Sequence, residues 1–237
     1  MNRVFIGYDH RQPISYQVLQ HSIVTRSSRP VSITPLILPQ LPLKRQGLTP
    51  FTFSRFLVPH LCHYYGWALF LDLDMLVLDD ISKLFALADE KYAVLVSKNE
   101  YRFEWASAIL YNCGHPANQI LTPEYIETAR KLHGIEWCAP ELVGDLPREW
   151  NHLVGYDPKR PDAKLVHYTQ GIPAFPETKT SEYSEEWHQE LKICNSAMSW
   201  ETLMGGSVHA TVVNGKIMPK FTVNASSYDK TNGVGLP

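Results

Sequence analysis

The sequence predicts an α/β protein, with a mostly parallel sheet flanked by helices in a single domain. Short apolar runs alternate with helical patterns through the first half of the chain, as they do in successive βαβ units. The 237 residues, 44% of them hydrophobic, are enough to bury one substantial core. Because no repeat or linker-like segment interrupts the chain, we take residues 1–198 as the domain and residues 199–237 as a partly loose C-terminal extension.

The first elements form a βαβ opening. Residues 4–7 are a short apolar strand, residues 14–23 carry apolar side chains at helical spacing, and residues 31–38 return as a second strand. Tyr8 and Asp9 follow the first strand directly. Ligands of open α/β sheets bind beyond the C-terminal ends of the strands, so these two side chains lie where a ligand is expected.

The later elements continue the alternation. A proline-containing surface loop over residues 39–50 leads into a helix over residues 52–61 that carries Arg55. Asp80 is suited to cap the helix that begins there. The other expected elements are a strand that begins at Trp67, strands over residues 92–97, 106–111 and 165–168, a strand that ends at Val154, and helices over residues 122–132 and 184–194.

The strand that begins at Trp67 ends in two carboxylates. Asp72 and Asp74 are separated by one residue, and since successive side chains of a strand alternate between faces, both point the same way. Two carboxylates this close repel each other and stay ionised only when a cation lies between them. Hard oxygen ligands favour Mg²⁺ or Mn²⁺, and such ions usually keep sites open for water or phosphate. The pair therefore predicts a metal site that serves nucleotide chemistry.

Charge and cysteine content argue against several classes of protein. The formal charge is −2 and no basic run is longer than Lys44-Arg45, so a nucleic-acid partner is not expected. The four cysteines show no metal-binding spacing and fit small core residues. We find no signal peptide and no apolar stretch near the ~20 residues that span a bilayer. We expect a reduced, cytoplasmic protein without a transmembrane segment, and peripheral membrane contact stays open.

Segments spread along the chain resemble family 8 glycosyltransferases of the GT-A fold. They are Thr-Phe-Ser-Arg-Phe-Leu-Val-Pro at residues 52–59, Leu-Asp-Leu-Asp-Met-Leu-Val-Leu-Asp-Asp-Ile at 71–81, Leu-Pro-Arg-Glu-Trp-Asn at 146–151 and His-Tyr at 167–168. The resemblance covers residues 3–175. It implies a GT-A-like, Rossmann-like sheet and transfer of a hexose from a nucleotide sugar, usually a UDP sugar, to an acceptor hydroxyl with retention. The donor hexose stays open, and the acceptor is a glycan or another hydroxyl compound.

By position, the resemblance assigns metal ligands and a donor contact. Asp72 and Asp74 match the metal-binding pair of the family, and His167 matches the third protein ligand of Mn²⁺, with Mg²⁺ as the alternative ion. Arg55 matches an arginine near the donor sugar, so we assign it to donor binding and catalysis. The structural alternative for Arg55 is an ion pair with an aspartate of the neighbouring strand.

The resemblance also places contacts to the base and to the substrate. We assign stacking on uracil to Tyr8 and a hydrogen bond with the base to Asp9. Asn151 and Ser107 are assigned to the substrate, and for Asn151 the alternative is a turn cap.

Two features of the family pattern are missing. The lysine that contacts the pyrophosphate is absent after His167, so Lys164, Lys179 or backbone N–H groups around Gly171 would replace it. The Asp-Gln pair near the donor sugar is not recognisable either, and we favour Glu141 as the catalytic carboxylate. Glu136 and Asp145 are the other candidates by location.

Two other functions remain open at this stage. A noncatalytic nucleotide-sugar-binding domain would explain the missing lysine. A haloacid-dehalogenase-type phosphatase also uses Asp-x-Asp after a strand, but there the motif follows the first strand, whereas Asp72 follows two expected strands.

Overall fold

The structure, a computed structural model, describes residues 1–196, 210–213 and 216–219. The chain divides into two units, Met1–Cys194 and Asn195–Pro237. In the second unit, β10 (Ala210–Val213) and β11 (Lys216–Pro219) pair as an antiparallel hairpin. The predicted boundary at residue 198 and the predicted loose end of the extension lie outside the described residues, so this division of the chain stays a prediction.

A six-stranded sheet forms the centre of the first unit. Its strands are β1 (Asn2–Gly7), β2 (Val31–Leu36), β3 (Trp67–Leu71), β5 (Val94–Val96), β6 (Ala108–Asn112) and β7 (Val143–Asp145). They lie in the order β2-β1-β3-β6-β5-β7. Only β6 runs antiparallel to its neighbours, β3 and β5, and the other pairings in this sheet are parallel. The predicted α/β class with a mostly parallel sheet is confirmed.

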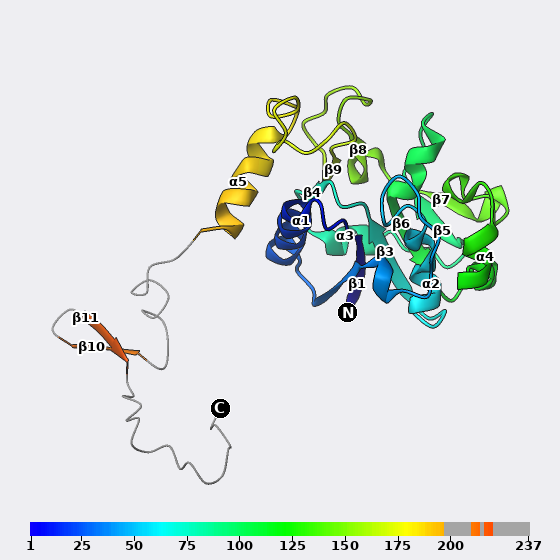
Figure 1. Ribbon diagram of the computed structural model, residues 1–237, viewed down its shortest axis with the longest axis horizontal. Coiled ribbons are helices and arrows are strands. Elements are labelled where there is room, and N and C mark those ends of the chain that lie inside the picture. The colour runs from blue at the N-terminus through cyan, green and yellow to red at the C-terminus, as the bar shows by residue number, and fades with distance from the viewer. Residues whose placement is uncertain (197–209, 214–215, 220–237) are drawn as a thin grey trace, which may run out of the picture. The chain divides into compact units, whose positions relative to one another are not determined.

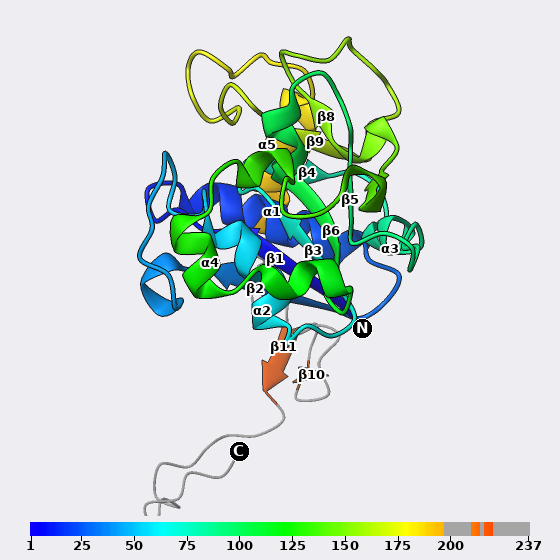
Figure 2. The ribbon, with the colours of Figure 1, turned by 90° about the vertical axis from the view of Figure 1, so that its right-hand side faces the viewer.

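The central strands are apolar along their whole length because both of their faces are covered. Every residue of β5 and β6 is buried, and so are the last four residues of β3. Helices supply the cover (Figures 1 and 2): α1 (Pro13–Arg26) and α5 (Ser184–Cys194) pack together on one side of the sheet, and α2 (Val58–Leu61) and α4 (Pro123–Thr128) lie on the other.

A second, smaller sheet continues from the end of β3. It contains β4 (Met75–Val77), β9 (Leu165–His167) and β8 (His152–Leu153), in the order β4-β9-β8. β4 and β9 are antiparallel, with Met75 opposite His167. Since β4 begins directly after the carboxylate pair, this register brings His167 next to that pair.

Local polar chemistry sets where the shorter helices begin and end. The Asp80 side chain accepts a hydrogen bond from the Ser82 N–H at 2.9 Å and caps α3 (Ile81–Phe85), as predicted. The helix predicted over residues 52–61 is instead a 3₁₀ turn, Ser54–Leu57, followed by α2, because Pro59 has no N–H with which to continue one helix.

The helix predicted over residues 122–132 ends early, at Thr128. The guanidinium of Arg45 donates to the carbonyls of Ile126 and Ala129, both at 2.7 Å, and so satisfies carbonyls at the end of this helix. The chain then turns through Lys131, whose φ of 59° is left-handed.

Glu190 of α5 pairs with His21 and Arg26 of α1. Its carboxylate is 2% exposed, lies 2.7 Å from Arg26 Nη2 and also pairs with His21 Nδ1. Burial acts to raise the pKa of Glu190, but the hydrogen bonds from Arg26 and His21 outweigh it and hold the pKa below its usual value. The ionised carboxylate therefore stabilises the packing of these two helices.

Glu190→Gln is expected to lower the free energy of unfolding by about 2 kcal/mol at neutral pH. Because the folded-state pKa is depressed, the contribution of the carboxylate is present above its unfolded-state pKa and is lost as the pH falls through the folded-state value. Urea unfolding of both proteins at neutral pH and well below about pH 4 measures this. A deficit of equal size at both pH values would mean that the substitution acts through packing and not through charge.

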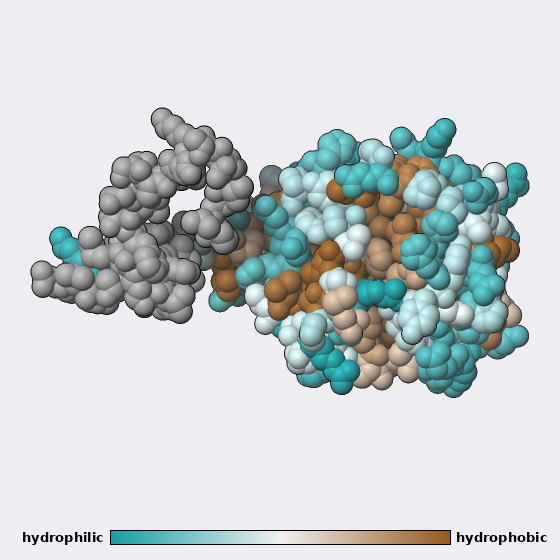
Figure 3. Space-filling view, turned by 90° about the horizontal axis from the view of Figure 1, so that it is seen from below, coloured by the Kyte–Doolittle hydropathy of each residue, from teal (hydrophilic) through white to brown (hydrophobic). Residues whose placement is uncertain are grey.

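No helix in the described part of the chain has the length and apolar character needed to cross a membrane. The predicted cytoplasmic location stays a prediction. Figure 3 views the first unit from the end at which β1 begins, and hydrophobic residues lie among hydrophilic ones on that face. The carboxylate pair lies at the opposite end of the strands, where β3 ends.

Candidate active site

The carboxylate pair lies at the C-terminal end of β3. Directly after the strand, the Asp72 N–H donates to the Ser107 carbonyl at 2.9 Å, which extends the pairing of β3 by one residue. The chain then bends at Leu73 and Asp74 before β4 begins. The bend, and not the alternation of a continuous strand, keeps ligand atoms of Asp72 and Asp74 within 4.8 Å of each other.

His167 completes a cluster of three ligand side chains. It lies at the end of β9, and the Tyr168 N–H donates to the Asp74 carbonyl at 2.9 Å. Nε2 of His167 lies 3.3 Å from Asp74 Oδ1. Among the residues that the structure describes, Asp72, Asp74 and His167 are the one group whose ligand atoms lie close enough together to hold a metal ion.

The chemistry of this donor set fits a divalent cation. Two carboxylate oxygens and one imidazole nitrogen suit Mn²⁺, and carboxylate with water suits Mg²⁺. Asp72 Oδ1 is buried and faces Arg55 Nη1 at 2.9 Å, and His167 Nε2 lies 3.3 Å from Asp74 Oδ1. The three side chains thus turn two carboxylates and one imidazole nitrogen toward one another, as the ligands of a shared cation would be.

Burial and charge shift the pKa of both buried ligands. Burial raises the pKa of Asp72 to about 7, although the Arg55 guanidinium acts to lower it. Burial acts to lower the pKa of His167, but the carboxylates of Asp74, Glu104 and Asp72 outweigh it and raise this pKa to about 9. The same carboxylates that favour a proton on the imidazole would favour a divalent ion, so the ion and the proton would compete for Nε2.

Arg55 is the counter-charge of Asp72. Its Nη1 lies 2.9 Å from Asp72 Oδ1, donates to Asp72 Oδ2 at 3.2 Å and donates to the Ala106 carbonyl at 2.8 Å. The guanidinium is buried and lies 5.1 Å from the centre of the Phe70 ring. The structural alternative for Arg55, an ion pair with an aspartate of the neighbouring strand, is therefore present. The contact of Arg55 with a donor sugar stays a prediction.

Glu104 is a site residue that the sequence did not reveal. It lies in the 3₁₀ segment Arg102–Ser107, and its Oε2 is 3.6 Å from His167 Nδ1. Burial raises the pKa of Glu104, and the His167 imidazole acts to lower it. No periodicity or motif marks this glutamate, because a 3₁₀ segment between strands carries neither.

Ser107 and Asn151 lie beside the carboxylate pair. Asn151 Nδ2 donates to Ser107 Oγ at 2.9 Å, and Ser107 Oγ donates to the Glu104 carbonyl at 2.6 Å. Asn151 is fully buried, and its Oδ1 accepts no hydrogen bond from the described residues. The assigned contact of these two side chains with substrate stays a prediction, and this free oxygen is the atom that would make it.

A cavity of about 500 Å³ lies where β1 and β2 end. Tyr8 lines it, and the predicted loop over residues 39–50 supplies much of the remaining wall. Asp9 is not free there, because its carboxylate accepts bonds from Arg11 Nε and Nη2, which hold its pKa below the usual value. The base contacts assigned to Tyr8 and Asp9 stay predictions, and Asp9 would have to give up Arg11 to make its contact.

The structure does not bring Glu141 to the cluster. Glu141 is exposed in the 3₁₀ turn Pro140–Leu142, which precedes β7, and β7 is parallel to β5. Glu141 therefore lies at the end of the sheet where the parallel strands begin, opposite to the end that carries Asp72. Location along the chain, on which the choice of Glu141 was based, did not show this, and the carboxylate that does face the cluster is Glu104.

The groups proposed to replace the missing lysine are partly engaged. Lys164 Nζ donates to Glu149 Oε1 at 3.3 Å. Lys164 directly precedes β9, whereas His167 is the last residue of that strand, so the two residues lie at opposite ends of β9. The Gly171 N–H donates to the Tyr168 carbonyl at 2.9 Å, and the φ of 116° at Gly171 explains why a glycine stands there. Lys179 is exposed. None of these roles is established.

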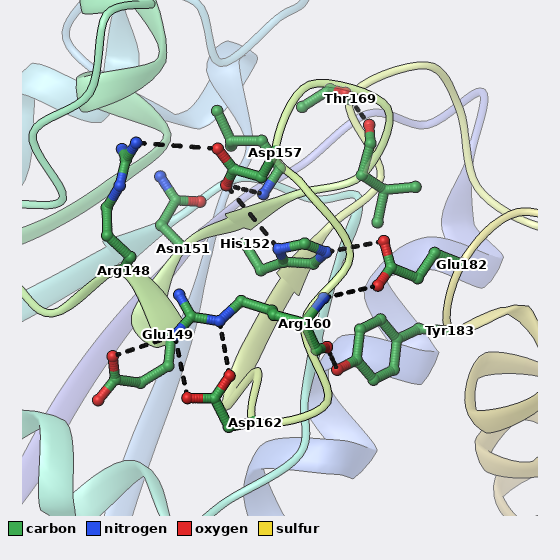
Figure 4. A network of polar contacts seen from close by, with 12 residues as sticks. Arg148, Glu149, Asn151, His152, Asp157, Arg160, Asp162, Thr169, Glu182 and Tyr183 are labelled. Carbon is green, nitrogen blue, oxygen red and sulfur yellow. Dashed lines mark hydrogen bonds and ion pairs between the residues drawn. The ribbon is translucent and has the colours of Figure 1, made fainter.

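A network of ion pairs holds the loops that follow His152 (Figure 4). The buried His152 lies between two carboxylates, with Nε2 3.0 Å from Glu182 Oε2 and Nδ1 3.8 Å from Asp157 Oδ2. Asp157 also accepts the Leu153 N–H at 2.9 Å, and Glu182 accepts the Arg160 N–H at 3.2 Å. The network ties the loops to β8, and backbone pairing holds β8 beside β9, the strand that carries His167.

The fold of this chain is found in solved glycosyltransferases. The chain has the fold of GT-A-type glycosyltransferases: it aligns with LgtC at a TM-score of 0.61 and 11% identity, over 84% of this chain and 99% of that one. It aligns with GlyE of Streptococcus pneumoniae at 0.60 and 16%, over 86% and 62%, and with the bifunctional WbbM at 0.59 and 15%, over 86% and 51%. This chain thus spans about half of WbbM and less than two thirds of GlyE.

The sequence itself gives a nearer relative. The chain is 41% identical over 227 residues to Protein CDI of Arabidopsis thaliana, an alignment that covers 81% of this chain and 87% of that protein. The chain belongs to the same family as Protein CDI. No protein-family model matches it.

Proposed function

We propose that this protein is a metal-dependent glycosyltransferase that moves a hexose from a UDP sugar to an acceptor hydroxyl with retention. The observation that carries the proposal is the cluster of Asp72, Asp74 and His167, which lies at the C-terminal end of β3 in a chain of GT-A fold. Ligands of open α/β sheets bind at this end of the strands. The resemblance to family 8 supports the UDP sugar and the retention of configuration.

Each described part of the site has a task in this proposal. The cluster would hold Mn²⁺ or Mg²⁺, and such an ion neutralises the charge that develops on a diphosphate leaving group. Arg55 favours the ionised form of the buried Asp72 and holds its carboxylate in place through a contact of 2.9 Å. Asn151 Oδ1 accepts a hydrogen bond from a hydroxyl of the sugar, and the cavity beside Tyr8 binds the base. The acceptor is a glycan or another hydroxyl compound.

LgtC, a galactosyltransferase, has been solved with donor and acceptor sugar analogues, which supports both kinds of partner for this fold. The phosphatase alternative is not favoured, because the carboxylate pair follows the third strand and the fold is that of glycosyltransferases. The noncatalytic alternative differs from our proposal in turnover alone, so the experiment must measure binding and turnover separately.

Calorimetric titration of UDP, GDP, ADP and CMP, each with Mn²⁺ and with a chelator, tests the proposal. We expect UDP to bind selectively and only with Mn²⁺, and we expect slow release of UDP from at least one UDP-hexose. Selective UDP binding without hydrolysis of any UDP sugar would indicate a binding domain. Absence of nucleotide binding under both conditions would contradict the proposed function.

A further inference from the structure

The two ring nitrogens of His167 face different carboxylates. Nε2 lies 3.3 Å from Asp74 Oδ1, inside the proposed metal site, and Nδ1 lies 3.6 Å from Glu104 Oε2. The imidazole is 4% exposed and the Glu104 side chain 14% exposed, so little water reaches either group. Among the described residues, Nδ1 has no hydrogen-bond partner.

This arrangement determines which tautomer of His167 could bind a cation. A neutral imidazole carries one proton, so coordination through Nε2 requires the proton to be on Nδ1. Histidines that bind metals nearly always donate this second N–H to a carboxylate, a carbonyl or water. The distance of 3.6 Å from Nδ1 to Glu104 Oε2 exceeds a hydrogen bond by a few tenths of an ångström. A shift of the Glu104 side chain by that amount would form the hydrogen bond.

Glu104 is held in this position by its own backbone. Its N–H donates to the Tyr101 carbonyl at 2.8 Å, and its carbonyl accepts the Ser107 hydroxyl at 2.6 Å. The Ser107 carbonyl in turn accepts the Asp72 N–H at 2.9 Å. Glu104 is therefore fixed to the same backbone as the carboxylate pair, yet it is not part of the group whose ligand atoms lie within 4.8 Å of one another.

We propose that Glu104 is a positioning residue: its carboxylate accepts a hydrogen bond from Nδ1–H of His167 and so directs Nε2 toward the divalent cation. This inference rests on the proposed function, because it presumes the metal site. It goes further by assigning a role to a residue outside the ligand group and outside every segment that resembles family 8. A carboxylate in this position both selects the tautomer and increases the basicity of the ligand nitrogen.

Glu104→Gln tests this role, because the glutamine keeps the size of the side chain and removes the charge. Mn²⁺ titrated in the presence of saturating UDP is expected to bind about 10-fold more weakly to the variant. The matched control is Glu182→Gln, which alters the carboxylate 3.0 Å from the buried His152 (Figure 4) and leaves the metal cluster intact. Its Mn²⁺ affinity is expected to equal that of the wild type, and equal weakening in both variants would overturn the proposal.

A second measurement on the wild-type protein is independent of the variants. With histidine labelled with ¹⁵N and Zn²⁺ as a diamagnetic ion, two-bond ¹H–¹⁵N correlation spectra identify the protonated nitrogen of His167, which is assigned with His167→Gln. We expect Nδ1–H in the wild type and a loss of this single form in Glu104→Gln. An unchanged spectrum together with unchanged affinity would overturn the role of Glu104, whereas a wild type that binds neither Mn²⁺ nor UDP would overturn the proposed function itself.

Discussion

Asp74→Asn is expected to weaken the Mn²⁺-dependent binding of UDP by roughly 100-fold or more, because it removes one of the two charged ligands of the proposed ion. Asp72 cannot compensate, since its charge is already shared with Arg55 at 2.9 Å. The folded state should change little. The loss of an attractive contact with His167 is offset by the loss of repulsion with Asp72, so the free energy of unfolding is expected to stay within about 1 kcal/mol of the wild-type value.

Asp79→Asn is the matched control for this experiment. Asp79 follows β4 and pairs with Lys83 at 2.7 Å on the surface, away from the ligand group. In UDP titrations with Mn²⁺ and with a chelator, the affinity of this variant for UDP is expected to equal that of the wild type. Full Mn²⁺ dependence in Asp74→Asn would show that the ion, if one binds, is held elsewhere.

The fold and the carboxylate pair could be predicted because their signals are local. A buried strand between covering helices is apolar throughout, and a pair such as Asp72 and Asp74 at the end of such a strand is visible in a few consecutive residues. The alternation of side chains along a strand does not by itself explain why Asp72 and Asp74 lie close together. The chain bends at Leu73 and Asp74, and a bend of this kind has no signature in the alternation of side chains.

The other members of the cluster depend on the topology. His167 reaches the pair through the register of β9 against β4, and only the resemblance to a known family pointed to it. Glu104 arrives on a 3₁₀ segment whose sequence has no period, and it was missed. Glu141 was favoured by its place along the chain alone, and the strand that separates it from the cluster, β7, had not been predicted. Contacts between distant segments are thus the part that a single sequence does not determine.

Arg55→Met is expected to have the largest effect on stability, about 3 kcal/mol at or above neutral pH. One part of this loss does not depend on pH: the variant gives up the hydrogen bonds from the guanidinium to the Asp72 carboxylate and to the Ala106 carbonyl at 2.8 Å. The other part depends on pH. When the Asp72 carboxylate loses its counter-charge, the pKa of Asp72 will rise above its wild-type value of about 7.

The sign of this pH dependence follows from a raised folded-state pKa. A buried carboxylate with a raised pKa adds no penalty below its unfolded-state pKa, and its penalty grows until the pH passes the folded-state pKa. In the wild type this growth ends near pH 7, whereas in Arg55→Met it continues above that pH at up to about 1.4 kcal/mol per unit. Urea unfolding of both proteins near pH 5 and above pH 8 should therefore show a deficit that increases with pH.

Asp72→Asn separates the two parts of this effect. In the Asp72→Asn background the carboxylate is gone. Arg55→Met should therefore lower the free energy of unfolding by the same amount at both pH values, and this amount should equal only the pH-independent part of the loss. The double-mutant cycle then measures the coupling between the two side chains, which the contact of 2.9 Å places above about 1 kcal/mol at neutral pH. If the deficit of Arg55→Met were independent of pH in both backgrounds, Arg55 would act through packing against Phe51 and Phe70, and another group would have to hold the charge of Asp72.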